Sequence, residues 1–135
     1  MSRVANIERF ESTQQRFDPG HPYLQVFEVE FPPSLNSMYR QYRGRTILSK
    51  RGREFKKCTF PPFNQYGDQD RLQVHLVLHP PRNFQFDCDN YAKPTLDLLE
   101  SRGVFRNDNQ IDYLTIRRGE VYPKRGRVVI TIDVL

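Results

Sequence analysis

Residues 72–79 read Leu72-Gln73-Val74-His75-Leu76-Val77-Leu78-His79. Large apolar side chains at every second position predict a β-strand with one face in the core. Pro80-Pro81 ends this strand, because proline cannot donate a ladder hydrogen bond. The next regular pattern, at residues 90–102, predicts an amphipathic helix whose buried stripe contains Leu96 and Leu99.

Further elements are expected on both sides of this strand and helix. A basic helix capped by Ser49 is expected from residue 50 to about residue 57, and residues 33–37 are expected to form a loop. Additional strands are predicted at residues 23–31, 45–49, 112–121 and 127–135, the last two forming a C-terminal β-hairpin. This order indicates an α+β fold: a single domain with a mixed β-sheet and two main helices on one face.

The chain has 135 residues, the usual size of one domain. Residues 23–135 are expected to form that domain, and the polar residues 1–22 an N-terminal arm or loop. No apolar run approaches the roughly 20 residues that cross a bilayer, and the N-terminus carries no apolar signal core. The sequence therefore predicts a cytoplasmic protein without a membrane partner, whose Cys58 and Cys88 are reduced thiols.

The charge falls into three segments. Residues 39–57 carry eight basic residues and one acidic residue, residues 86–112 carry six acidic and three basic residues, and residues 117–127 carry five basic residues and one acidic residue. Basic segments on both sides of an acidic one suit a protein that holds a polyanion on its positive surfaces and a cation in a carboxylate cluster. Solvated surface charges that alternate along the chain give the same pattern.

The acidic segment contains Asp87-Cys88-Asp89-Asn90-Tyr91-Ala92-Lys93. In an extended chain, Asp87 and Asp89 project to the same side. Two adjacent carboxylates repel each other unless a proton or a cation bridges them, and hard oxygen ligands suit Mg²⁺ or Mn²⁺. Lys93 and Asn90 share a face of the following helix, so Lys93 is expected to point toward the carboxylates and to stabilise charge on a phosphate.

A third carboxylate is expected from the loop after this helix, and the residue types leave Asp108 and Asp112 as alternatives. The same residues also have purely structural explanations. Asp89 is a good helix N-cap, and Lys93 and Asp97 have the spacing of an ordinary ion pair on a helix surface.

Three ordered segments resemble the RusA-like Holliday-junction resolvases, a family of small endonucleases from bacteria and their phages. The first begins with Pro32-Pro33-Ser34-Leu35-Asn36 and runs to Gly52. The second, residues 87–93, fits the family pattern D-x-D-N-x-x-K, and the third runs from Asp97 to Ile111. The resemblance extends to residue 132 and so covers most of the chain.

The resemblance implies a Mg²⁺-dependent endodeoxyribonuclease that resolves four-way DNA junctions by paired symmetric nicks, with Mn²⁺ able to replace Mg²⁺. By motif position, Asp87, Asp89 and Asp108 are its catalytic carboxylates and metal ligands, and Lys93 is its catalytic lysine. The family works as a homodimer, which suits a junction with two-fold symmetry. This implies branched DNA and a second copy of the chain as partners, in a bacterial or phage-infected cell.

Basic side chains are expected to contact DNA phosphates independently of sequence. They are Arg40, Arg43, Arg45, Lys50, Arg51, Arg53, Lys56, Arg117 and Arg118. Phe84 and Phe86 stand where some family members carry arginines. They suit either stacking on unpaired bases at the junction centre or packing in the core or a dimer.

Two other functions fit the same residues. One is a less selective nuclease for branched or flap DNA, and the other is a catalytically silent protein that binds DNA junctions. The full set of carboxylates with Lys93 argues against the silent protein, because a pure binder gains nothing from carboxylates that face phosphate.

Overall fold

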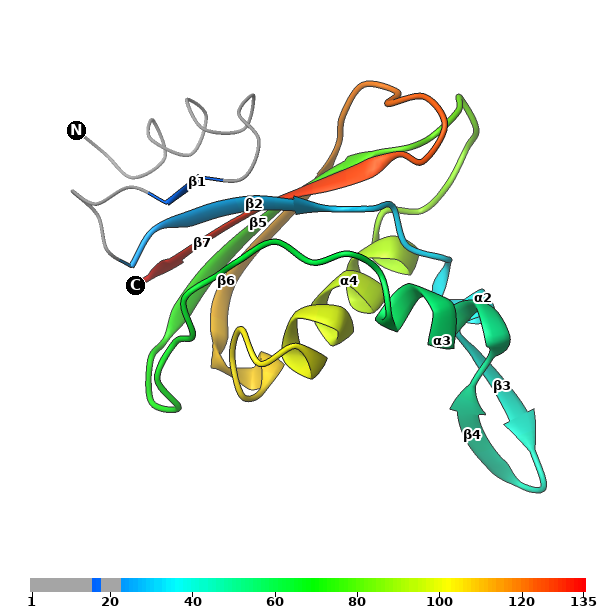
Figure 1. Ribbon diagram of the computed structural model, residues 1–135, viewed down its shortest axis with the longest axis horizontal. Coiled ribbons are helices and arrows are strands. Elements are labelled where there is room, and N and C mark those ends of the chain that lie inside the picture. The colour runs from blue at the N-terminus through cyan, green and yellow to red at the C-terminus, as the bar shows by residue number, and fades with distance from the viewer. Residues whose placement is uncertain (1–15, 18–22) are drawn as a thin grey trace.

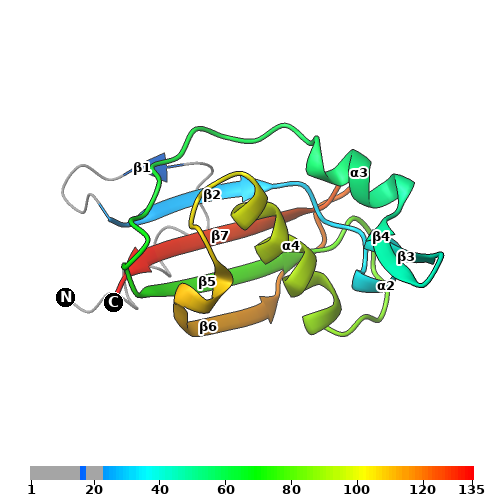
Figure 2. The ribbon, with the colours of Figure 1, turned by 90° about the horizontal axis from the view of Figure 1, so that it is seen from below.

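The computed structural model describes residues 16–17 and 23–135. Its main layer is a mixed five-stranded sheet with the order β1-β2-β7-β5-β6 (Figure 1). The strands are β1 (Arg16–Phe17), β2 (Gln25–Val29), β5 (Leu72–His79), β6 (Ile111–Arg118) and β7 (Arg127–Val134). Helices α3 (Lys50–Lys56) and α4 (Asp89–Ser101) lie on one side of this sheet (Figure 1, Figure 2). The predicted α+β class, mixed sheet and two main helices are confirmed.

Part of the expected N-terminal arm, residues 1–22, joins the sheet. Arg16–Phe17 forms strand β1, which pairs antiparallel with β2 at the sheet edge. The rest of the arm lies outside the described residues. Among the residues that are described, no helix is both long enough and apolar enough to cross a membrane.

Strand β5 pairs antiparallel with β7 and parallel with β6. The sequence predicts one buried face for β5, but both of its faces are buried from Leu72 to Leu78. The polar side chains satisfy each other: His75 Nε2 lies 3.0 Å from Gln73 Oε1, and His75 Nδ1 contacts the Thr115 hydroxyl. Paired in this way, the polar groups avoid most of the cost of burial.

The expected C-terminal hairpin is split. Strands β6 and β7 run in opposite directions and are joined by a short loop, but β5 lies between them and pairs with both. The loop crosses the end of β5, where Gly119 N donates to Leu78 O and Tyr122 N donates to Pro80 O, both at 2.8 Å. Strand β5, buried on both faces, thereby has neighbours on both edges and leaves no edge to solvent.

Helix α4 packs its apolar stripe on the sheet. Leu96 and Leu99 are buried as predicted, and they join one core cluster with Ala92, Val74 and Ile130. The helix boundaries agree with the predicted residues 90–102 within one residue at each end.

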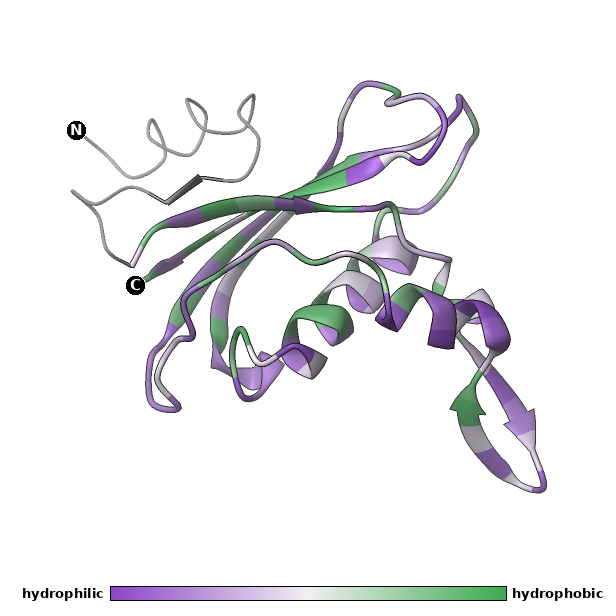
Figure 3. Cartoon of the chain, viewed as in Figure 1, coloured by the Kyte–Doolittle hydropathy of each residue, from purple (hydrophilic) through white to green (hydrophobic). Residues whose placement is uncertain are grey.

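The region between β2 and α3 differs from the sequence-based expectation. The predicted loop at 33–37 contains a short helix, α2 (Leu35–Met38), and the predicted strand at 45–49, observed as β4 (Arg45–Leu48), has an unpredicted partner, β3 (Tyr39–Tyr42). Strands β3 and β4 form a hairpin that projects away from the sheet (Figure 1), which we call the basic hairpin. Figure 3 shows hydrophilic residues on β3 and on much of α3. The predicted Ser49 cap is confirmed, because Gly52 N donates to Ser49 Oγ at 3.0 Å.

Candidate active site

The acidic motif lies at the start of helix α4. Asp87 precedes the helix, Cys88 is the N-cap residue, and Asp89 is the first helical residue. The Cys88 backbone is helical, with φ −57° and ψ −38°, so the segment turns rather than extends as expected. Asp89 is therefore not the N-cap. Both aspartates are exposed, and a negative charge in the first turn is favoured by the helix dipole.

Lys93 lies one helical turn after Asp89 and makes two ion pairs. Its Nζ donates to Asp108 Oδ2 at 2.7 Å and lies 3.1 Å from Asp97 Oδ1. The hydrogen bond to Asp108, together with Asp97, raises the pKa of Lys93 above its ordinary value. Lys93 therefore carries a fixed positive charge at neutral pH.

Asp97 is more than the helix-surface partner of Lys93. Its side chain is only 16% exposed, and its Oδ2 accepts a hydrogen bond from the Tyr39 hydroxyl at 2.7 Å. Tyr39 begins strand β3, so this contact connects the basic hairpin to α4. Burial and the Asp97 hydrogen bond raise the pKa of Tyr39 to about 12, so its hydroxyl remains a donor at neutral pH.

Asp108 opens a short 3₁₀ turn, η1 (Asp108–Gln110), that follows α4. Its backbone N–H donates to Glu100 Oε1 at 2.9 Å. The buried Gln110 side chain fixes the turn, because it accepts from Asn107 N at 3.2 Å and donates to the Gly67 carbonyl at 2.9 Å. These contacts hold Asp108 beside Lys93 although 15 residues separate them.

The alternative third carboxylate, Asp112, has a different partner. Arg71 Nε donates to Asp112 Oδ2 at 2.9 Å, and this exposed pair lowers the pKa of Asp112. Asp108, rather than Asp112, is the acid that contacts Lys93.

The structure brings Lys93, Asp97 and Asp108 together. Among the residues it describes, no three His, Cys, Asp or Glu side chains form a group that could hold a metal ion. The expected ligands Asp87 and Asp89 stay at the exposed start of α4, while Asp108 is held by an ammonium group. The donor chemistry of these carboxylates fits a hard divalent cation such as Mg²⁺.

Three contributors to the site were missed at the sequence level: Tyr39, Glu100 and the second contact of Asp97. Lys93, Asp97 and Glu100 have the spacing i, i+4, i+7, which places them on one helix face. That spacing is the sequence signal for two of them. Tyr39 has no such signal, because it lies 58 residues away from Asp97 in the chain.

An aromatic cluster holds the segment that leads into the acidic motif. The centroid distances are 5.0 Å for Phe84 and Phe86, 5.1 Å for Phe86 and Tyr91, and 4.8 Å for Phe31 and Tyr91. Arg118, at the end of β6, donates to the Phe86 carbonyl, and its guanidinium lies 4.2 Å from the Phe86 ring centroid. Phe86 also packs against the core. Base stacking and packing were the two roles considered for Phe86, and in this structure its ring packs against the core.

The basic residues expected to contact DNA lie on three elements, and all except Lys56 are exposed. They are Arg40, Arg43 and Arg45 on the basic hairpin, Lys50, Arg51, Arg53 and Lys56 on α3, and Arg117 and Arg118 on β6. Arg53 has a local partner as well, since its Nη1 donates to Leu48 O at 3.0 Å.

Two tyrosines should make the protein less stable at alkaline pH. Burial is the main cause that raises the pKa of Tyr39 to about 12 and the pKa of Tyr66 as well. The folded protein thus holds these protons more tightly than the unfolded chain. The resulting stabilisation is complete below pH 10 and is lost as the pH rises toward 12. Urea unfolding should give a smaller free energy at pH 11 than at pH 9, and Tyr66→Phe should reduce this difference. An equal free energy at both pH values would contradict the burial argument.

Comparison with known proteins shows the family of this chain. The family model described as Endodeoxyribonuclease RusA matches residues 30–133. A crossover junction endodeoxyribonuclease rusA of Enterobacteria phage HK97 is 29% identical over 113 residues, which are 81% of this chain and 93% of that protein. The Escherichia coli K12 protein of the same description is 29% identical over 109 residues, which are 77% of this chain and 89% of that protein. The chain belongs to the RusA family of endodeoxyribonucleases.

Proposed function

We propose that this protein is a divalent-metal-dependent endodeoxyribonuclease that resolves Holliday junctions by paired symmetric nicks. The family to which it belongs is one of metal-dependent nucleases, and the relatives named above are crossover junction endodeoxyribonucleases. The observation that carries the proposal is the charge arrangement at α4. Two exposed carboxylates, Asp87 before the helix and Asp89 at its first position, lie one turn before Lys93, which donates to Asp108 at 2.7 Å.

In this proposal Asp87, Asp89 and Asp108 hold the metal, for which Mg²⁺ is the expected ion and Mn²⁺ a substitute. A bound divalent ion lowers the pKa of a coordinated water and stabilises the charge that develops on phosphate. Lys93 supplies a further positive charge to the phosphate. Asp97 acts as a positioning residue because it pairs with the Lys93 ammonium group, and Tyr39 acts through Asp97, to which its hydroxyl donates.

The basic hairpin and α3 bind the DNA backbone in this proposal. Their arginines and lysines contact phosphates, which positions the substrate without reading its sequence. The Tyr39–Asp97 hydrogen bond supports a connection between this surface and α4. The same role is proposed for Arg117 and Arg118 on β6.

A homodimer is the proposed working form. One chain offers one carboxylate cluster, and two symmetric cuts across a two-fold junction need two. The proposed place of action is the cytoplasm of a bacterial or phage-infected cell, in line with the phage and bacterial relatives. Light scattering of the protein with a four-way junction tests the assembly, and a complex containing one copy of the chain would contradict it.

The proposal is tested with a panel of substrates of equal length: a four-way junction, a flap and a linear duplex. Each is incubated with Mg²⁺, with Mn²⁺ or with a chelator. A resolvase should cut the junction at least about 10-fold faster than the flap or duplex, and only with divalent metal. Equal rates on the flap and the junction would support the less selective nuclease instead.

Replacing Asp97 with asparagine should lower kcat for junction cleavage about 10- to 100-fold and leave KM unchanged. Groups that orient catalytic side chains have effects of this size. The variant keeps the side-chain shape but removes the charge that pairs with Lys93. The matched control is Asp68→Asn, which breaks an exposed ion pair with Arg106 elsewhere and should keep the wild-type kcat. An equal loss in both variants would rule out a positioning role for Asp97.

A further inference from the structure

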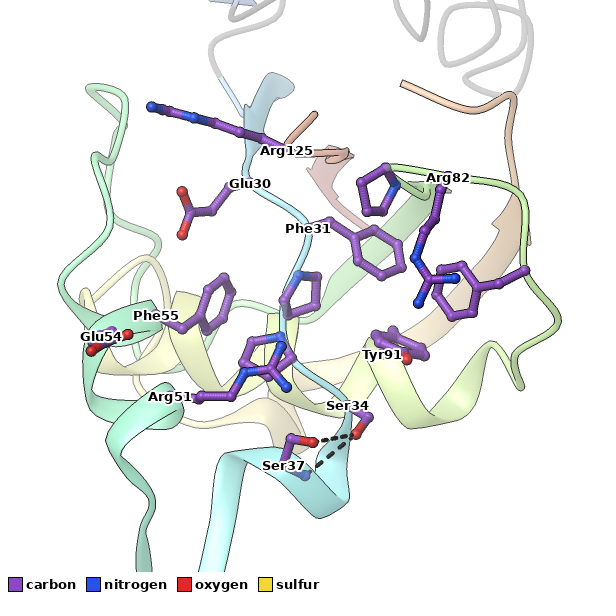
Figure 4. Close-up of a pocket in the computed structure, with 14 residues that line it drawn as sticks. Glu30, Phe31, Ser34, Ser37, Arg51, Glu54, Phe55, Arg82, Tyr91 and Arg125 are labelled. Carbon is purple, nitrogen blue, oxygen red and sulfur yellow. Dashed lines mark hydrogen bonds between the residues drawn. The ribbon is translucent and has the colours of Figure 1, made fainter. Parts of the chain in front are cut away.

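A cleft of about 500 Å³ lies beside the first turn of α4 (Figure 4). It is formed by the segment after β2, by α3, and by the loops near residues 82 and 125. Tyr91, two residues after Asp89, lines this cleft. The same ring lines a shallower pocket together with Asp87 and Asn90. The cleft therefore adjoins the acidic motif through one side chain.

One side of the cleft is aromatic. Phe31, Phe84 and Tyr91 line it, and each ring is half-buried, so each leaves part of its surface accessible. Phe31 and Tyr91 lie 4.8 Å apart and fix each other's position. Nucleic-acid bases stack on such rings whatever their identity.

The charges in the cleft are unevenly distributed. Arg82 lies on the aromatic side, with its guanidinium 4.8 Å from the Phe84 ring centroid, and Arg51 extends from α3 into the space between (Figure 4). Glu30 and Glu54 lie on the opposite side, and Arg125, which also lines the cleft, lies on the Glu30 side (Figure 4). Arginine binds phosphate in a planar, bidentate manner, whereas carboxylates repel it. A phosphate is therefore favoured near Arg51 and Arg82 and disfavoured near the two glutamates.

We propose that this cleft holds one unpaired nucleotide of the branched DNA. Its base stacks on Tyr91 or Phe31, and its phosphate binds Arg51 and Arg82. The inference rests on the proposed junction substrate, because a strand-exchange point is where a base can leave its pair. A volume of about 500 Å³ lies within the range of pockets for small ligands, roughly 300–1,000 Å³. The two glutamates disfavour a continuous phosphate backbone across the cleft, which favours a single nucleotide as the occupant.

Photo-cross-linking tests where the unpaired base lies. A four-way junction carries one 5-iododeoxyuridine at each exchange-point position in turn, and irradiation is done in EDTA so that no strand is cut. From at least one position, mass spectrometry should find the cross-link on Tyr91 or Phe31. A junction labelled within a duplex arm should give no such product. Cross-links that fall only outside the cleft would overturn the proposal.

Binding affinity in EDTA gives the second readout. Wild-type protein should bind the junction at least about 5-fold more tightly when the identified position carries a base than when it is abasic. Leucine in place of the cross-linked ring, Tyr91 or Phe31, should remove this difference, and Tyr91→Phe should keep it. Arg51→Ala should weaken junction binding. Lys57→Ala is the control and should not weaken it, because Lys57 is an exposed residue at the end of α3 and lies outside the cleft. Equal affinity of the wild type for the base and the abasic junction would overturn the inference.

The two proposals fail separately, because neither readout needs cleavage. A protein that cuts junctions but shows no cross-link in the cleft and no base dependence overturns the nucleotide cleft alone. A protein that gives the cross-link in the cleft and the base-dependent affinity, but cuts no strand, supports the nucleotide cleft and overturns the nuclease activity.

Discussion

Replacing Asp89 with asparagine should abolish junction cleavage while leaving junction binding intact. The change keeps the side-chain size at an exposed position in the first turn of α4, so stability should fall by no more than about 1 kcal/mol. The proposed metal site loses one of its charged ligands. The single-turnover rate on a labelled four-way junction should therefore fall by at least about 10²–10³-fold, as when one preorganised electrostatic contact is removed from an active site.

The matched control is Asp112→Asn. Asp112 is also exposed and also acidic, but it pairs with Arg71 rather than with Lys93. This variant should cleave at the wild-type rate. If Asp112→Asn lost as much activity as Asp89→Asn, the assignment of the carboxylates to the active site would be wrong.

Replacing Gly52 with alanine should destabilise the protein by about 2–3 kcal/mol and lower Tm by about 10 °C. A Cβ at this position would lie 2.3 Å from Met38 O and 3.1 Å from Leu48 Cδ2. The Met38 carbonyl cannot retreat easily, because Met38 is fully buried and its oxygen accepts from Ser49 N at 2.9 Å. Helix α3 must therefore move away from α2. Since α3 and the basic hairpin carry the proposed phosphate contacts, junction affinity should fall as well.

Gly67→Ala provides the comparison for this stability effect. The nearest atom to a Cβ there is Asp70 Oδ2 at 3.2 Å, the end of a flexible side chain on an exposed loop. Thermal unfolding of the two variants should differ by several degrees, with Gly67→Ala close to wild type. Similar Tm values for both variants would show that α3 tolerates the added methyl group.

The elements that the sequence predicted well are those set by local chemistry. Helix α4 follows from the spacing of Leu96 and Leu99, and α3 begins where the Ser49 side chain caps it. The basic hairpin was half missed, because β3 is polar and largely exposed and so lacks apolar alternation. Its turn depends on Arg43 and Gly44 at φ 50° and 77°, and arginine is an unusual residue for that conformation.

Strand order was harder to predict than strand position. Strands β6 and β7 adjoin in sequence and read as a simple hairpin, but the burial of both faces of β5 favours a place between them. Periodicity describes one strand at a time and carries no information about its neighbours. The expected extended form of the Asp87–Asp89 segment failed for a related reason, since the helix begins one residue earlier than expected and draws Cys88 into a helical conformation.

The candidate site was predicted as a set of residue types, and its geometry was not. The pairing of Lys93 with Asp108 depends on η1, whose position is fixed by the buried Gln110 rather than by any acidic residue. The contribution of Tyr39 depends on how the basic hairpin folds against α4. Such contacts arise from tertiary packing between segments that are distant in the chain.

We expect the acidic start of α4 to cut DNA junctions in a paired manner. The most direct test is nick mapping on a four-way junction labelled separately on each of its four strands, with Mg²⁺ present and the Asp89→Asn protein in parallel. The wild type should nick two opposing strands at symmetric positions, and the variant should nick none. A junction that is bound but left uncut by the wild type, in Mg²⁺ and in Mn²⁺, would contradict it.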